Sequence, residues 1–173
     1  MKRFPFLLLD AGPIIKLFKL GIWEEFISRC DVTVSRTVAE EAQYASREFE
    51  DICIELEPYA AQERIAIVDV ELLNIRTFRE KIDLANKAVV HAGELETLAF
   101  MLGSSEDWLL CAADGAVFRV LGLLGKGEQG ISLEEVLKKI GLQQDMERQY
   151  TKRFREEHTR RGQIDRLHGG GFA

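Results

Sequence analysis

The sequence predicts an α/β domain, a three-layer sandwich in which a central, mostly parallel β-sheet of four to five strands is flanked by helices. Two observations lead to this fold class. Short apolar runs, typical of buried parallel strands, alternate along the chain with segments of helical periodicity. The length of 173 residues suits one domain that folds around its own core without a metal or disulfide.

Four short apolar runs are expected to form the strands. The first covers residues 4–9 and ends at Asp10. Gly12 and Pro13 follow it, and Pro13 suits the first turn of a helix. The other three runs cover residues 32–34, 65–70 and 108–112. Because helical segments separate the runs, the strands are expected to be parallel.

Helices are expected where apolar residues recur three or four positions apart. Two of them begin with a capping-box pattern, in which a Ser or Thr is followed three positions later by a Glu. These are Thr37 with Glu40, and Ser132 with Glu135. The predicted helices cover residues 14–18, 22–27, 72–82, 95–102, 117–124, 132–141 and 143–161, with a further helix that begins at Thr37.

Charge divides the chain into two expected regions, 1–142 as the α/β domain and 143–173 as a charged helix with a loose tail from Gly162 onward. Residues 148–161 carry six basic and two acidic side chains, whereas the whole chain has a net charge of −6. This basic segment is a solvated helix face, holds phosphates or docks a partner. Tyr150 and Phe154, four positions apart, would be exposed on a lone helix, which favours docking.

Composition argues against several classes of protein. No apolar run approaches the roughly 18 residues of a membrane helix, so no membrane association is expected. The three cysteines show no disulfide or zinc spacing and favour a reducing, cytoplasmic setting. The G-x-G-x-x-G pattern at residues 125–130 follows a predicted helix instead of a strand, and therefore predicts a turn and not a dinucleotide site.

Two aspartates stand where ligands of α/β proteins bind. Asp10 and Asp114 each follow an apolar strand and precede a helix. Both are therefore expected at the carboxyl edge of the sheet, where open α/β sheets bind their ligands. The alternative is that each aspartate only caps the helix that follows it.

Glutamates add to this acidic set. The capping box accounts for Glu40 and leaves Glu41 without a structural role. Glu94 stands where a helix begins, and Glu96 lies about 200° around that helix from it. Glu94 is therefore the stronger candidate for the site. The alternative for both Glu94 and Glu96 is stabilisation of the helix dipole.

Carboxylates that converge at one sheet edge repel one another, and such a cluster persists at neutral pH mainly when cations fill it. Ligands that are all oxygen suit Mg²⁺ or Mn²⁺. These ions activate water and stabilise an in-line displacement at phosphorus. The chemistry that the sequence predicts is hydrolysis of a phosphodiester.

At these residues the sequence resembles the PIN-domain nucleases. The resemblance rests on LLLDAGPII, VAEEA, GELETLA and the pair Asp114 and Arg119, which occur in the family's order over residues 4 to about 140. The sequence departs from the family at two positions. Gly12 stands where members often carry Ser or Thr, and Ala113 stands where many carry a second acid or a Thr.

The resemblance implies metal-dependent cleavage of RNA. In that case Asp10, Glu94 and Asp114 bind the principal Mg²⁺ or Mn²⁺, while Glu41 and Glu96 hold a second ion or position water. The catalytic set is then Asp10, Glu41, Glu94 and Asp114. Small family members are often dimeric toxins of toxin–antitoxin pairs, so RNA, a protein antitoxin and a second copy of the chain are the expected partners. The alternative is a catalytically weak PIN-like domain that binds RNA or protein as a regulatory module.

Overall fold

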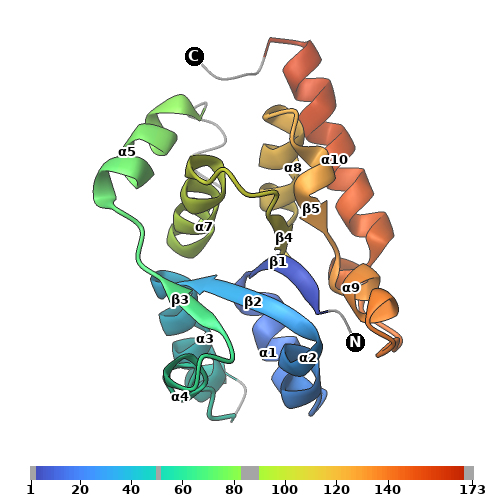
Figure 1. The fold of residues 1–173 in the computed structure, drawn as a ribbon. Helices are drawn as coiled ribbons and strands as arrows, with labels where there is room; N and C mark the ends of the chain where they lie inside the picture. Colours follow the sequence, from blue (N-terminus) through green and yellow to red (C-terminus); the bar gives the residue numbers. More distant parts are fainter. Residues whose placement is uncertain (1–2, 50–51, 83–89, 170–173) are drawn as a thin grey trace.

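A single parallel β-sheet forms the centre of the computed structural model, which describes residues 3–49, 52–82 and 90–169 (Figure 1). The strands are β1 (Phe4–Leu9), β2 (Cys30–Ser35), β3 (Ala66–Val68), β4 (Leu109–Cys111) and β5 (Gly130–Ile131). They lie in the order β3-β2-β1-β4-β5, and every neighbouring pair is parallel.

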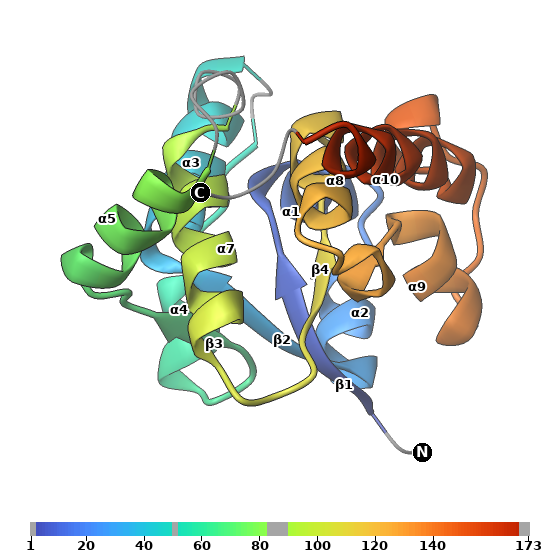
Figure 2. The ribbon, with the colours of Figure 1, turned by 90° about the horizontal axis from the view of Figure 1, so that it is seen from above.

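Helices cover both faces of this sheet (Figure 2). The helices are α1 (Ala11–Lys19), α2 (Trp23–Arg29), α3 (Arg36–Phe49), α4 (Glu57–Ala61), α5 (Leu72–Lys81), α7 (Ala92–Gly103), α8 (Gly115–Leu123), α9 (Leu133–Lys139) and α10 (Lys152–Leu167). The predicted three-layer α/β sandwich is therefore confirmed. None of the helices in the described ranges is long and apolar enough to cross a membrane.

The central strand β1 explains the two helical layers. Side chains of a strand point alternately to opposite faces of the sheet. Leu7 and Leu9 pack with α1, α2, α3 and α9, whereas Leu8 packs with α5, α7 and α8. All three leucines are fully buried. This burial on both faces accounts for the continuous apolar run in the sequence.

The strand order creates a crevice at one edge of the sheet. The chain adds β2 and β3 on one side of β1, and then β4 and β5 on the other side. The order thus reverses between β1 and β4, and ligands of open α/β sheets bind at the carboxyl ends of the strands at such a switch point. Asp10 lies at this switch point, and its N–H donates a hydrogen bond to the carbonyl oxygen of Cys111 at 3.0 Å.

One of the two predicted capping boxes is confirmed. At α9, the Ser132 N–H donates to Glu135 Oε2 at 2.9 Å, and the Glu135 N–H donates to Ser132 Oγ at 3.2 Å. The box predicted for Thr37 and Glu40 is wrong. Since β2 runs directly into α3, its last residue, Ser35, caps the helix and accepts a hydrogen bond from the Val38 N–H at 3.3 Å.

The C-terminal region also differs from the prediction. Residues 143–147 are not helical, and α10 continues past Gly162, which was expected to begin a loose tail. Gly162 is buried where α10 crosses α8. A Cβ atom on Gly162 would lie 1.9 Å from the Arg119 carbonyl oxygen, and one on Gly122 would lie 2.2 Å from that of Thr159. The two glycines allow the helix backbones to touch. Residues 170–173 of the expected tail lie outside the described residues.

Two ion pairs hold α10 against its neighbours. Arg155 donates two hydrogen bonds to the Glu135 carboxylate at 2.8 and 3.0 Å, and both side chains are largely buried. Arg119 Nε donates to Asp165 Oδ2 at 2.6 Å. Figure 1 shows α10 lying beside α8.

The aromatic pair of the basic segment packs within the chain itself. Phe154 packs on the same core cluster as α7 and α8. Tyr150 packs on the opposite cluster, and its hydroxyl donates to the Gly12 carbonyl oxygen at 3.4 Å. The exposure that favoured docking of a partner is thus absent from these two side chains.

Gly162→Ala is expected to lower the free energy of unfolding by about 3 kcal/mol, because the new methyl group would force α8 and α10 apart. Urea denaturation measures this change. Gly103→Ala is the matched control, since it lies in a helix with no atom within 4 Å of the new methyl group and is expected to be neutral or slightly stabilising. Equal stability of both variants would contradict the role of the α8–α10 contact.

Candidate active site

A cleft with a volume of about 980 Å³ opens at the carboxyl ends of β1 and β4. Four acidic side chains line it, each from a different part of the fold: Asp10, Glu41, Glu94 and Asp114. They are the four residues that the sequence analysis predicted as catalytic. The structure therefore brings together side chains that are far apart in the sequence.

The two aspartates lie at the junctions between strand and helix. Asp10 follows β1 and is only 8% exposed, and Asp114 follows β4. Asp114 Oδ1 accepts a hydrogen bond from the Ala116 N–H at 2.7 Å, so this residue also caps α8. Asp114 therefore caps α8, as the alternative proposed, and also lines the cleft.

The two glutamates meet where α3 passes the start of α7. Glu94 Oε2 accepts a hydrogen bond from the His91 N–H at 2.9 Å, and Glu41 Oε1 accepts one from the Gly93 N–H at 3.2 Å. A Cβ atom on Gly93 would lie 2.5 Å from Glu41 Oε2. Any larger residue at position 93 would therefore displace the Glu41 carboxylate from its present position.

Glu96 is the predicted metal ligand that the structure does not bring to the cleft. Its carboxylate is 6% exposed and accepts a hydrogen bond from the Thr37 N–H at 2.9 Å. This contact places a negative charge at the N-terminus of α3, where it stabilises the helix. The two-residue separation from Glu94 accounts for the difference, because it turns Glu96 away from the cleft around α7.

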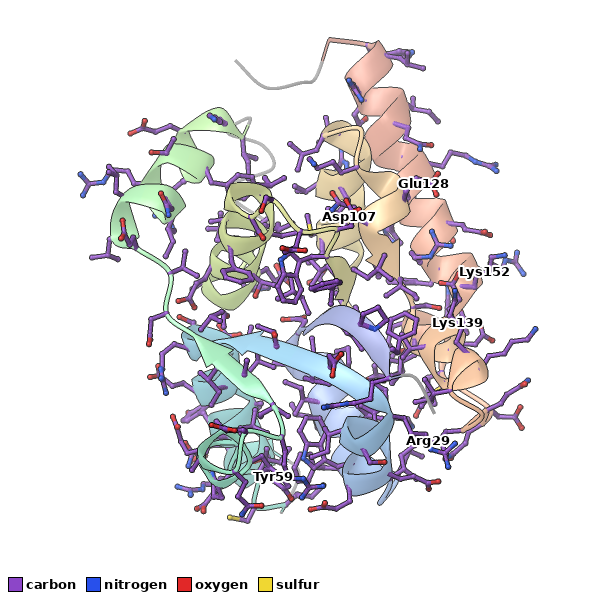
Figure 3. All side chains as sticks on the ribbon, viewed as in Figure 1. Arg29, Tyr59, Asp107, Glu128, Lys139 and Lys152 are labelled. Carbon is purple, nitrogen blue, oxygen red and sulfur yellow. The ribbon has the colours of Figure 1, made fainter. Side chains whose placement is uncertain are left out.

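Burial gives the cleft unusual acid–base properties. Burial is the main cause and the neighbouring carboxylates of Glu41 and Asp114 add to it, so that the pKa of Asp10 is raised to about 6 and that of Glu94 to about 8. Exposed charged side chains such as Lys139 and Lys152 instead lie on the outer surface of α9 and α10 (Figure 3). The negative charges of the cleft thus lack the solvation that charges elsewhere on the molecule have.

The chemistry of these carboxylates fits a hard divalent cation. The donor set consists of oxygen atoms, and mutual repulsion disfavours its fully ionised form. Within the described ranges, no three acidic, His or Cys side chains converge closely enough to hold an ion. Mg²⁺ commonly binds through only one or two carboxylates and completes its shell with water and substrate phosphate. Asp10, Glu41, Glu94 and Asp114 are the residues here that could hold such an ion.

The two departures from the PIN-domain pattern lie against each other. A Cβ atom on Gly12 would be 3.0 Å from the Cβ of Ala113. A Ser or Thr at position 12 would therefore need Ala113 to shift. Gly12 and Ala113 both line the cleft and contribute no polar side-chain group to it.

Three aromatic or imidazole side chains also line the cleft, namely His91, Phe154 and His158. His91 is the exposed residue that precedes α7. Phe154 and His158 come from α10. Their position could not be predicted, because only the packing of α10 on α8 brings them to the cleft. Arg119, which with Asp114 is part of the PIN-domain resemblance, pairs with Asp165 of α10.

Comparison with other proteins adds no relative to this description. The sequence matches no protein-family model, and no curated protein shows significant similarity to it. The candidate site is therefore argued from its geometry and chemistry.

Without bound cations, the protein is expected to lose stability as the pH rises. Asp10 and Glu94 bind protons more tightly in the folded chain than in the unfolded chain, where their pKa values are about 4. Their stabilising effect is complete below that pH and is lost as the pH rises through about 6 and then about 8. Urea denaturation in EDTA is expected to give a free energy of unfolding a few kcal/mol lower in alkaline than in mildly acidic buffer. Glu94→Gln should remove the loss above neutral pH, and a loss of the same size in that variant would contradict the assignment.

Proposed function

We propose that the protein is a cytoplasmic ribonuclease that depends on Mg²⁺ or Mn²⁺ and hydrolyses RNA phosphodiester bonds. The observation that carries this proposal is that four carboxylates line one cleft at the switch point of the sheet, two of them with strongly raised pKa values. A bound divalent cation would supply electrostatic stabilisation of the charge that develops at phosphorus, and would activate water.

The four carboxylates have different proposed roles in binding the cation, the water and the substrate. Asp10 and Glu94 are the most buried of the four carboxylates, and burial penalises their charged forms most. A bound cation would therefore offset the largest cost of burying negative charge at these two positions. Asp114 is fixed by its hydrogen bond to the start of α8, and Glu41 by its hydrogen bond to Gly93. Fixed carboxylates of this kind hold ion, water and substrate in one orientation.

A cleavage assay tests the proposal. The purified chain is incubated with a labelled single-stranded RNA and either Mg²⁺, Mn²⁺ or EDTA. We expect cleavage with the metals and none with EDTA. Binding of RNA without cleavage in any of these metals would favour the alternative, a PIN-like domain that acts as a binding or regulatory module.

The resemblance to PIN-domain toxins extends the proposal to a toxin that is held by a protein antitoxin and acts as a homodimer. Expression of the wild-type chain is then expected to arrest bacterial growth, whereas expression of Asp10→Asn is not. Equal growth with both chains, at equal protein levels, would remove the support for a toxin and leave the ribonuclease proposal to the cleavage assay.

A further inference from the structure

We propose that His158 of α10 contacts the substrate directly, through a hydrogen bond from its imidazole to the RNA backbone beside the bond that is cleaved. This inference rests on the proposed ribonuclease function and adds to it a residue outside the acidic set. It makes α10 a wall of the active site as well as a structural helix.

The position of His158 beside Asp114 is set by a glycine. A Cβ atom on Gly115 would lie 2.3 Å from both Cε1 and Nδ1 of the His158 ring. The imidazole therefore occupies the space that a side chain at position 115 would fill. Because Gly115 directly follows Asp114, the ring lies at the cleft wall next to a catalytic carboxylate.

A second contact also holds the ring in place. The rings of Phe154 and His158 lie 4.3 Å apart between their centroids. Phe154 is itself packed on the core cluster, and the α8–α10 glycine contact fixes the helix that carries both residues. Phe154 and Gly115 thus act as positioning residues for the imidazole. A side chain fixed in this way loses little entropy when it binds a ligand.

Its polar atoms are available to a ligand. No described residue forms a hydrogen bond with the ring nitrogens of His158, although the ring lines the cleft. An imidazole offers a donor or an acceptor at each nitrogen. The oxygens of an RNA backbone bound next to Asp114 would lie in the same cleft and could accept a hydrogen bond from a ring nitrogen of His158.

The surrounding charge also suits an anionic substrate at this wall. Arg148 and Arg161 both bind Glu157, the neighbour of His158 in α10, at 3.1 and 2.9 Å. Both arginines are exposed. Both arginines act electrostatically on His158, and positive charge close to this ring attracts phosphate groups.

His158→Phe tests the inference, because phenylalanine keeps an aromatic ring between Gly115 and Phe154 but has no polar atom. We expect KM for single-stranded RNA to rise about tenfold with kcat nearly unchanged, as for a hydrogen bond made equally in the bound and transition states. Gly115→Ala should displace the imidazole and raise KM similarly, and the double variant should be no worse than either single variant. His168→Phe, an exposed histidine after α10 and outside the cleft, is the matched control.

A binding measurement separates this inference from the proposed function. Fluorescence anisotropy of labelled RNA is recorded for Asp10→Asn and for Asp10→Asn with His158→Phe, with and without Mg²⁺. Weaker binding by the double variant supports the contact. If the wild type cleaves RNA but His158→Phe changes neither KM nor binding, the contact is overturned and the ribonuclease stands. If the wild type neither cleaves nor binds RNA, both proposals fall.

Discussion

Asp10→Asn is expected to lower the rate of RNA cleavage by about a thousandfold or more, because a ligand to the catalytic ion contributes several kcal/mol to transition-state stabilisation. Asp10 is nearly fully buried at the centre of the sheet edge, and the asparagine side chain has the same shape without the charge. The rate is measured on labelled RNA at saturating Mn²⁺.

The fold of this variant should remain intact. Removal of a buried charge that has no cation relieves desolvation and repulsion, so the melting temperature in EDTA is expected to equal or exceed that of the wild type. Asp107→Asn, a change at an exposed aspartate outside the cleft, is the control and should cleave normally (Figure 3). Cleavage by Asp10→Asn at the wild-type rate would exclude Asp10 from the catalytic set.

Glu41→Gln is expected to lower cleavage by about a hundredfold, the upper range for residues that orient ligands or water around a metal. Its stability should be unchanged, since the glutamine oxygen can still accept the hydrogen bond from Gly93. Glu40→Gln is the matched control, because Glu40 is exposed and lines a separate groove. The cleavage rates of the two variants are measured side by side on the same labelled RNA. A larger loss for Glu40→Gln would show that the assignment of these two neighbours is reversed.

Elements that depend on local sequence could be predicted, whereas their arrangement could not. The apolar run before Asp10 and the capping box at Ser132 depend on residues within a few positions, and both appear as predicted. The order of the strands depends on contacts between distant segments, and any buried apolar run suits several positions in a sheet. The short strand β5 was missed for a related reason, since its two residues are too few to show a period.

The same distinction applies to the site. Asp10 and Asp114 could be predicted because parallel strands end at one edge of the sheet, whichever order they take. Glu96 was included through the PIN-domain resemblance, and the sequence does not show that the Thr37 N–H donates a hydrogen bond to its carboxylate. His158 could not be found, because it reaches the cleft only through the close contact between α8 and α10.

Binding of Mn²⁺ tests the central claim most directly, since the claim is that the four carboxylates form a divalent-metal site. Electron paramagnetic resonance of free Mn²⁺ is recorded as wild-type protein, Glu94→Gln or Glu96→Gln is added. We predict that the wild type and Glu96→Gln remove the free-ion signal to a similar extent, and that Glu94→Gln removes far less. Equal binding by wild type and Glu94→Gln, or no binding by the wild type, would contradict the account.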